Sequence, residues 1–394
     1  MSHGSSFPPY SLAFPFAARE AKPSSSPDTR PRGRVYPSQR IHEFVRKGYF
    51  GTSAEIEPRQ IQPASLDLRL GSLAYRVRAS FLPGKFTTVK TRIDELGMTE
   101  IDLREGALFE KRCVYIVPLK EQWCFPESED DISGKANPKS TTGRLDIFTR
   151  LITDYAIEFE TVQAGYIGPL YAEIVPRTFS VMVKEGMALN QLRFVKGRPR
   201  PVREDSSFDK HDEVTPRAYN PDDSPAESVK LISLDLVGSG NAIVGYRAKP
   251  HAPLIDLALV NHYDPSEFWE PIRSGNRIIL NPDDFYILVS KQKVWIPPDW
   301  SAEMVAYDAS YGEFRSHYAG FFDPGFGYDV ASGRGTRAVL EVRSHEVPFV
   351  VEDGQIVGRL EYERLLEPPE KIYGPKIGSS YQSQGLSLSK QFRR

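Results

Sequence analysis

The sequence has few cysteines and no long apolar segment. Only two cysteines, Cys113 and Cys124, occur among 394 residues. Two cysteines are too few for the disulfide framework of a secreted scaffold, so we expect a reducing, cytoplasmic environment. No apolar run approaches the roughly 20 residues that a membrane helix needs. The N-terminus also has no charged region followed by an apolar one, so the sequence predicts neither secretion nor membrane anchoring.

The sequence also lacks an excess of one charge and a zinc-binding pattern. Its 50 basic and 52 acidic residues give a net charge of −2, so no global field attracts nucleic acid. Zinc-dependent nucleobase deaminases need His-x-Glu followed by Pro-Cys-x-x-Cys. His211 and Glu213 match the first part, but no cysteine follows them. We therefore expect no zinc and no metal held by the protein, and local Lys and Arg side chains must hold any anionic ligand.

Short β-type runs separated by Pro, Gly and Asp dominate the rest of the chain. Examples are residues 114–117, 156–159, 170–175 and 179–183. One amphipathic helix is predicted from Ser38 to Lys47, with Ser38 as its N-cap. The pattern predicts a mainly β protein, a barrel or sandwich, with a few short helices.

Two β-rich blocks resemble each other. Tyr115 and Tyr286 lie in similar strand-like segments, and Gly186 and Gly354 lie in similar turns. The two residues of each pair are separated by nearly the same number of positions. The segment 66–70 resembles 255–259 at a larger interval, which would imply a longer loop early in the second copy. A period this long indicates a duplicated domain. The predicted organisation is a disordered tail (1–34), a first domain (35–200), a linker (201–229), a second domain (230–370) and a C-terminal closing tail (371–394).

A candidate anion site lies at residues 139–144. Apolar residues recur at helical spacing from Leu145 to Ile152, so we predict a helix that begins near Ser140. Lys139, Ser140 and Arg144 would offer an anion a cation, a hydroxyl and a planar guanidinium. The alternative is an ordinary capped helix with solvated charges.

Each β-rich block carries a glutamate inside an apolar strand. Glu173 lies in the first block, and Glu341 follows it in the second at the interval of the repeat. Burial is costly for a carboxylate and raises its pKa toward the range useful for a general base. Arg315 likewise follows Arg144 at almost the same interval. The alternative is that each glutamate lies on a solvated strand face. Residues 373–385 are polar, aromatic and rich in glycine, and we interpret them as a lid or as a disordered end.

Together these segments resemble the bacterial dCTP deaminases, a family of the dUTPase-like superfamily. The matching segments are 40–44, 61–71, 139–144, 165–173, Tyr373 and 381–384. The resemblance implies two tandem dUTPase-like distorted β-barrels, and a homotrimer with sites between barrels. It further implies a metal-free, hydrolytic deamination of dCTP to dUTP and ammonia, supplying dUTP for dTTP synthesis. Mg²⁺ would be carried with the nucleotide triphosphate.

The family pattern also assigns roles to individual residues. Glu173 would act as general acid/base on a water that attacks C4 of cytosine, with Ser140 and Arg144 holding that water and the developing charge. The remaining residues expected to bind substrate are Lys139, Thr141, Arg315, Ala319, Asp323, Glu341, Tyr373, Lys376, Tyr381 and Gln384. The alternatives are a dUTP pyrophosphatase, a bifunctional deaminase that forms dUMP, and a non-catalytic nucleotide-binding protein.

The two halves depart from the family pattern in complementary ways. The first half has Gln163 where the family has an aspartate, whereas the second half keeps Asp323 but lacks a clean serine motif. We therefore predict a composite site that joins Ser140, Arg144 and Glu173 of a first barrel to Asp323 of a second barrel. The alternative is two independent sites, with Glu341 catalytic in its own right.

Overall fold

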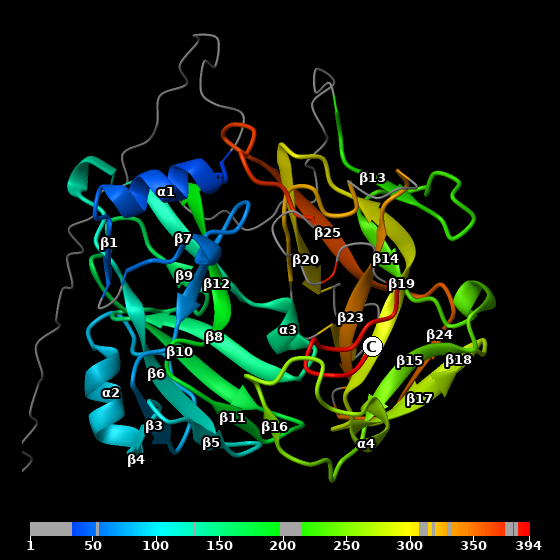
Figure 1. Cartoon of the computed structure of the whole chain (residues 1–394), viewed down its shortest axis with the longest axis horizontal. Coiled ribbons are helices and arrows are strands. Elements are labelled where there is room, and N and C mark those ends of the chain that lie inside the picture. The colour runs from blue at the N-terminus through cyan, green and yellow to red at the C-terminus, as the bar shows by residue number, and fades with distance from the viewer. Residues whose placement is uncertain are drawn as a thin grey trace, which may run out of the picture. The chain divides into compact units, whose positions relative to one another are not determined.

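The computed structural model describes residues 34–52, 55–129, 131–197, 214–306, 314–316, 320–328, 333–344, 346–374, 381 and 385–394. Strands predominate in these ranges and the helices are short, which confirms the predicted mainly β class (Figure 1). None of the described helices is long and apolar enough to cross a membrane.

The first barrel comprises residues 35–197. Its elements are α1 (Ser38–Arg46), β1 (Phe50–Thr52), η1 (Pro58–Gln60), β2 (Leu66–Arg69), β3 (Leu73–Val77), α2 (Val89–Leu96), β4 (Gly97–Asp102), β5 (Ala107–Phe109), β6 (Val114–Trp123), η2 (Glu127–Glu129), β7 (Ile132–Pro138), α3 (Ser140–Gly143), β8 (Ile147–Thr153), β9 (Thr161–Val162), β10 (Gly168–Pro176), β11 (Val181–Val183) and β12 (Ala188–Lys196).

The second barrel comprises the described residues from 214 to 366. Its elements are β13 (Arg217–Tyr219), β14 (Leu231–Ser233), η3 (Gly238–Gly240), β15 (Ile243–Ala248), β16 (Ile255–Asp256), α4 (Pro265–Phe268), β17 (Trp269–Arg273), β18 (Arg277–Leu280), β19 (Tyr286–Trp295), β20 (Trp300–Ala306), β21 (Phe314–Ser316), β22 (Phe321–Phe322), β23 (Thr336–Ser344), β24 (Phe349–Glu352) and β25 (Ile356–Arg364).

The sheet topology shows that the two barrels are copies. The order β4-β3-β6-β10-β8 in the first barrel matches β17-β15-β19-β23-β21 in the second. The order β2-β12-β7-β9 likewise matches β14-β25-β20-β22. Figure 1 shows the first copy in blue to green and the second in green to red.

One predicted correspondence between the copies is wrong. The topological counterpart of β2 is β14, and Asp235 follows Asp67 at the same interval at which Glu341 follows Glu173. The segment that begins at Ile255 is instead β16, which pairs in parallel with β11 of the first barrel. The alternation of apolar residues with a single aspartate is short enough to occur by chance outside the repeat.

The helix predicted to run on from Ser140 is also wrong in extent. Helix α3 ends at Gly143, and Asp146 has a positive φ of 55° that breaks the helical path. Residues 147–153 form β8, in which Ile147, Thr149 and Leu151 are buried alternately. Both helix and strand bury a subset of apolar residues, and here pairing with β10 outweighs the helical spacing.

Three smaller expectations also differ from the structure. Residues 156–159 form no strand, and residues 217–219 of the predicted linker form β13, which pairs with β19. The N-cap of α1 is Pro37, and the Ser38 hydroxyl bonds the neighbouring Gln39 side chain. Residues 1–33, 198–213 and 375–380 lie outside the described ranges.

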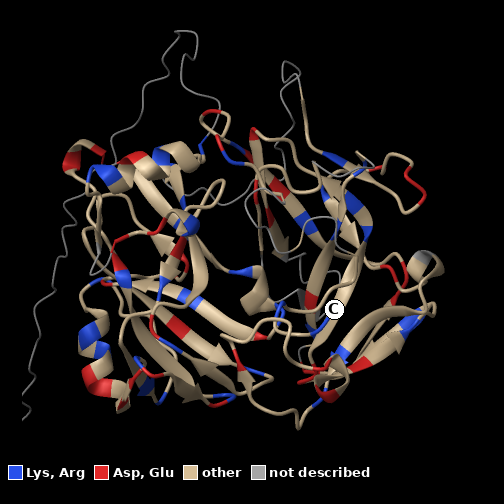
Figure 2. Cartoon of the chain, viewed as in Figure 1, with Lys and Arg blue, Asp and Glu red and all other residues tan. Residues whose placement is uncertain are grey.

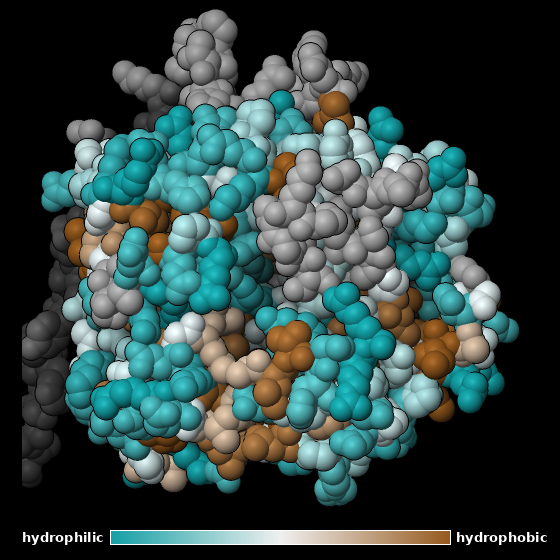
Figure 3. Space-filling view, in the orientation of Figure 1, coloured by the Kyte–Doolittle hydropathy of each residue, from teal (hydrophilic) through white to brown (hydrophobic). Residues whose placement is uncertain are grey.

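An apolar core runs continuously from the first barrel into the second. Phe179 follows β10, and its ring centroid lies 5.4 Å from that of Trp269 in β17. Near the C-terminus, Phe392 is buried against Phe268 and Trp269. The last residues of the chain therefore pack against the second barrel. Apolar residues reach the surface only in separate small groups on the face shown in Figure 3.

Buried ion pairs also cross between the barrels. The Arg343 guanidinium at the end of β23 contacts both carboxylate oxygens of Asp146, which closely follows α3, with Nε at 3.2 and 3.1 Å. Lys135 in β7 pairs with Glu303 in β20. Figure 2 shows that other charges of both signs are interspersed over the two barrels.

We expect the Asp146–Arg343 pair to be essential for stability. Asp146→Asn leaves a buried guanidinium uncompensated, which should lower the free energy of unfolding by about 3–5 kcal/mol. Arg40→Met removes the exposed Arg40–Glu367 ion pair and should cost about 1 kcal/mol or less. Urea unfolding measures both, and equal effects would contradict this assignment. The double variant Asp146→Asn/Arg343→Met should recover part of the loss.

Candidate active site

A small cavity of about 60 Å³ lies between α3 of the first barrel and the β20–β23 region of the second. The first barrel contributes Lys139, Ser140 and Arg144, and the second contributes Asp323 and Glu341. Its complete lining is Pro138, Lys139, Ser140, Gly143, Arg144, Met304, Gly320, Phe321, Phe322, Asp323, Phe326, Val339, Glu341, Tyr373 and Tyr381. One chain thus brings Ser140 and Arg144, from the predicted first half of the composite site, together with Asp323 from the predicted second half.

The turn at α3 fixes Ser140 and Arg144. Strand β7 ends at Pro138, and the Lys139 N–H donates to the Leu189 carbonyl in β12. The Lys139 carbonyl then accepts the N–H groups of Thr142 and Gly143, which closes a single helical turn. Arg144 is buried at the end of this turn, where its guanidinium lies 3.7 Å from the ring centroid of Tyr381 and donates to the Ser387 carbonyl. The C-terminal tail therefore covers α3.

Glu341 is a buried carboxyl group of the cavity, and its pKa is raised. It lies in the middle of β23, opposite Ile287 of β19, and only 7% of the residue is exposed. Burial raises the pKa of Glu341 to about 7, and the positive charge of Arg144 limits that rise. A carboxyl with this pKa can both accept and donate a proton near neutral pH.

Asp323 stands at the start of a tight turn. The Phe326 N–H donates to the Asp323 carbonyl, and Gly325 and Gly327 have positive φ angles of 93° and 70°. A Cβ on Gly327 would lie 2.1 Å from the Val294 carbonyl oxygen, so the turn requires glycine there. Burial raises the pKa of Asp323, and Arg193 opposes that rise. Its Oδ1 is buried without a hydrogen-bond donor in the structure.

The structure does not bring Glu173 to this cavity. Glu173 is fully buried in β10, where its Oε1 accepts a hydrogen bond of 3.0 Å from Nε of Arg150 in β8. The Arg150 guanidinium in turn lies over the rings of Phe148 and Phe159. Glu341 therefore has the place beside Ser140 and Arg144 that the sequence comparison gave to Glu173. The two copies carry the same strand glutamate, and only the tertiary arrangement reveals which one faces α3.

The other predicted residues divide into three groups. The Thr141 hydroxyl bonds the Tyr381 hydroxyl at 2.9 Å, and the Tyr381 N–H donates to the Tyr373 hydroxyl, so these three residues meet at the site. Only the backbone of Arg315 is described, in β21. Ala319, Lys376 and Gln384 lie outside the described residues.

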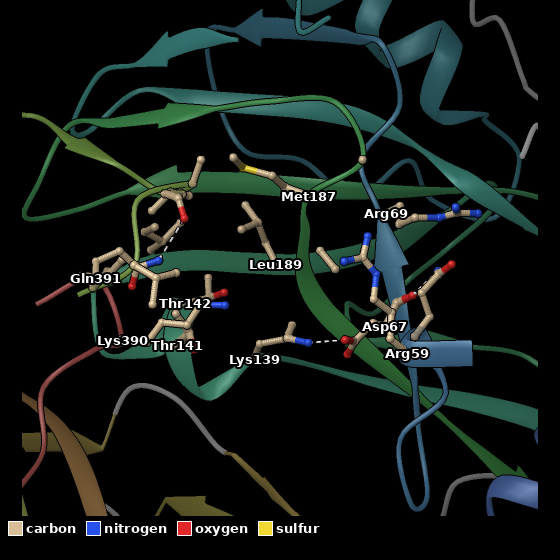
Figure 4. A pocket seen from close by; sticks show the side chains of 18 of the residues that line it. Arg59, Asp67, Arg69, Lys139, Thr141, Thr142, Met187, Leu189, Lys390 and Gln391 are labelled. Atoms are coloured by element: carbon tan, nitrogen blue, oxygen red, sulfur yellow. Dashed lines mark hydrogen bonds and ion pairs between the residues drawn. The ribbon is translucent and has the colours of Figure 1, made fainter. Parts of the chain in front are cut away.

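A larger cavity of about 350 Å³ adjoins the small one through Lys139, which lines both (Figure 4). Lys139 forms an ion pair with Asp67 of β2, and Lys390 also lines this cavity. Burial and the nearby Lys139 lower the pKa of Lys390, so an anion placed between the two ammonium groups would relieve their repulsion. No sequence pattern distinguished Lys390, because a lysine in a polar tail resembles a solvated one.

The described side chains include no group of three or more His, Cys, Asp or Glu residues arranged to hold a metal ion.

Known proteins match both halves of the chain. Residues 32–198 match the model of the 2'-deoxycytidine 5'-triphosphate deaminase (DCD) N-terminal domain, and residues 206–392 match that of its C-terminal domain. A "dCTP deaminase, dUMP-forming" of Dictyoglomus turgidum is 27% identical over 192 residues, which are 48% of this chain and 94% of that protein. The enzyme of the same name from Halobacterium salinarum is 31% identical over 116 residues, 29% of this chain and 55% of that protein.

A solved structure covers both barrels. The crystal structure of 2'-deoxycytidine 5'-triphosphate deaminase from Agrobacterium tumefaciens is similar with a TM-score of 0.75 and 45% sequence identity, over 85% of this chain and 99% of that one. Both domain models and this full-length match agree, and the chain therefore belongs to the 2'-deoxycytidine 5'-triphosphate deaminase family.

Proposed function

We propose that this chain deaminates dCTP to dUTP and ammonia in the small cavity between the barrels, with Glu341 transferring the protons. The observation that carries the proposal is a buried carboxyl with a pKa of about 7 that shares one cavity with Ser140 and Arg144. The names of the family relatives support dCTP as substrate. Release of ammonia from dCTP by the purified chain tests it directly.

The reaction needs one carboxyl group that works twice. Ionised Glu341 takes a proton from water, and the oxygen forms a bond to C4 of cytosine. Protonated Glu341 then gives this proton to N3 of the ring. It next takes the proton of the new C4 hydroxyl and delivers it to the exocyclic nitrogen, so the C4–N bond breaks, ammonia leaves and C4 becomes a carbonyl. The Ser140 hydroxyl and the Arg144 guanidinium hold the water and stabilise the charge that develops on the ring. Proton transfer of this kind contributes about 10²–10⁴-fold to the rate.

The surrounding residues suit the other parts of a deoxynucleoside triphosphate. Oδ1 of Asp323 accepts no hydrogen bond in the structure and lies 3.6 Å from Nη2 of Arg193, and it would accept a hydrogen bond from the sugar hydroxyl. Lys139 borders both cavities, so the phosphates can extend past it toward Lys390 in the larger one. Mg²⁺ would be carried with these phosphates as part of the substrate. Tyr381, stacked on Arg144, helps to exclude water.

Formation of dUMP is a second candidate, favoured by the names of the Dictyoglomus and Halobacterium relatives. In that reaction a further water would cleave the bond between the α- and β-phosphates. The products separate the two functions, because dUTP alone indicates a simple deaminase, whereas dUMP with pyrophosphate indicates the bifunctional one.

We expect Glu341→Gln to abolish ammonia release, lowering the rate by at least about 10²-fold, because the amide cannot shuttle protons. Glu173→Gln is the matched control, since it changes the equivalent strand residue of the other barrel. It should keep most of the activity. Steady-state rates and melting temperatures of both variants decide the assignment. A folded Glu173→Gln variant without activity beside an active Glu341→Gln variant would transfer the role to Glu173.

The same glutamate should make stability depend on pH. The pKa of Glu341 rises from 4.5 when unfolded to about 7 when folded, so the folded state binds its proton more tightly. Its contribution to stability is complete below pH 4.5 and is lost as pH rises through 7. Relative to the wild type, Glu341→Gln should therefore raise the free energy of unfolding by up to about 3 kcal/mol at pH 9 and change it little at pH 4.5. Urea titrations at both pH values measure the difference, and a stabilisation independent of pH would contradict the raised pKa.

A site built within one chain makes a prediction about mixed variants. Arg144→Met and Glu341→Gln each disable one half of the cavity. If each chain supplies both halves of its own site, co-refolding the two variants should restore no ammonia release beyond the sum of the separate proteins. Recovered activity would show that the working site joins different chains.

A further inference from the structure

Arg193 reaches from the first barrel into the second. It lies in β12, and 1% of the residue is exposed. Its Nη1 donates to the Ala302 carbonyl of β20 at 3.1 Å, and its Nη2 donates to the Phe322 carbonyl of β22 at 3.0 Å. One guanidinium thus holds the backbone of two strands that pair with each other immediately before the turn at Asp323.

The same guanidinium also contacts the turn itself. Nη2 lies 3.6 Å from Oδ1 of Asp323, and the central guanidinium carbon lies 3.9 Å from the ring centroid of Phe321. Two carbonyls, a carboxylate and an aromatic face therefore surround a single planar group. Lysine cannot reproduce this arrangement, because its ammonium has neither the fork geometry nor the flat face.

We propose that Arg193 is a positioning residue for substrate recognition: it fixes the turn that carries Asp323 and directs that carboxylate at the sugar hydroxyl. The inference rests on the proposed function, in which Asp323 binds the sugar. In this arrangement, a residue of β12 in the first barrel positions Asp323, the residue of the second barrel that binds the sugar hydroxyl.

The charges around Asp323 support this role. Asp67 of β2 raises the pKa of Asp323, as burial does, whereas Arg193 and Lys139 lower it, and Arg193 is the larger of these two opposing influences. Burial and the nearby Asp323 carboxylate both raise the pKa of Tyr373. Without Arg193, Asp323 would be more readily protonated, and a neutral carboxyl accepts a weaker hydrogen bond than a charged one.

A purely structural role makes a different prediction. If Arg193 served only to join the barrels, its loss would lower stability without changing the choice between substrates. A deoxynucleoside triphosphate carries a single free sugar hydroxyl, at C3'. The relevant probe is therefore the ratio of kcat/KM for dCTP to that for 2',3'-dideoxycytidine triphosphate, which lacks that hydroxyl.

The experiment compares Arg193→Met, Asp323→Asn, the double variant and Lys135→Met in the full chain. Lys135→Met removes another ion pair between the barrels, the one with Glu303, and does not alter the contacts of Asp323. Arg193→Met and Asp323→Asn should each lower the dCTP preference by about tenfold or more, the effect of one hydrogen bond to a charged group. The double variant should match Asp323→Asn, because both act through one contact. Lys135→Met should reduce the melting temperature and keep the preference.

Two further measurements keep the proposal testable. The Glu341→Gln variant, which should not turn over substrate, allows the affinity for dCTP to be measured as the pH is lowered. When Arg193→Met is added, the loss of affinity should begin at a higher pH. If Arg193→Met does not fold, Arg193→Lys keeps the charge without the fork and should show an intermediate preference. An unchanged preference in a folded Arg193 variant, beside a lost preference in Asp323→Asn, would overturn the role of Arg193. An unchanged preference in Asp323→Asn would overturn the sugar contact itself.

Discussion

The site depends on charged groups that are buried where the two barrels meet. Asp146 and Arg343 are withdrawn from water together, and each closely follows a residue of the cavity along the chain, Arg144 or Glu341. Their attraction offsets the cost of desolvation only while the barrels remain in contact. The contact that holds the fold together is therefore the same one that places the serine and arginine of one barrel beside the glutamate of the other.

Duplication has allowed equivalent residues to take different roles. Glu173 and Glu341 occupy the same position of equivalent strands, yet Glu173 is paired with Arg150 from its own barrel, whereas Glu341 is set against Arg144 from the other. Glu173 thus has an ion-pair partner on the neighbouring strand of its own barrel. A buried carboxyl whose counter-charge lies further away keeps a pKa near neutrality and can exchange protons. The neighbour, and not the strand position, decides between an ion pair and an acid/base group.

The sequence predicted the parts of the site that short motifs carry. Ser140 and Arg144 were predicted from an anion-binding helix start, and Asp323 from the resemblance to the family; all three line the small cavity. The choice between Glu173 and Glu341 depends on which barrel face meets α3, and no local pattern contains that information. Arg193 was missed for a related reason, since an arginine between Leu192 and Phe194 in a strand gives no sign that its acceptors lie in another barrel.

The predicted fold shows the same division between local and distant information. Alternating apolar residues and turn signals were sufficient for the mainly β class, and similar segments that recur at a nearly constant interval were sufficient for the duplication. The segment from Leu145 to Ile152 was misassigned as helix because its apolar spacing fits both a helix and a strand, and the pairing partner that selects the strand, β10, lies further along the chain. The false repeat at Ile255 has a comparable origin, because β16 adds to a sheet of the first barrel and not to its own.

The asymmetry between the barrels also explains why a chain of this kind would keep both. In the first barrel, the position of the family aspartate is taken by Gln163, whose amide donates to Glu158. That barrel consequently offers no carboxylate at this position for a sugar hydroxyl, while its α3 turn is intact. In the proposed site, Asp323 and Glu341 of the second barrel would act together with Ser140 and Arg144 of the first, and all four line one cavity. Once each half of the cavity came from a different barrel, loss of either barrel would remove the whole site. Selection on a single composite site is then sufficient to maintain two copies whose individual motifs are incomplete.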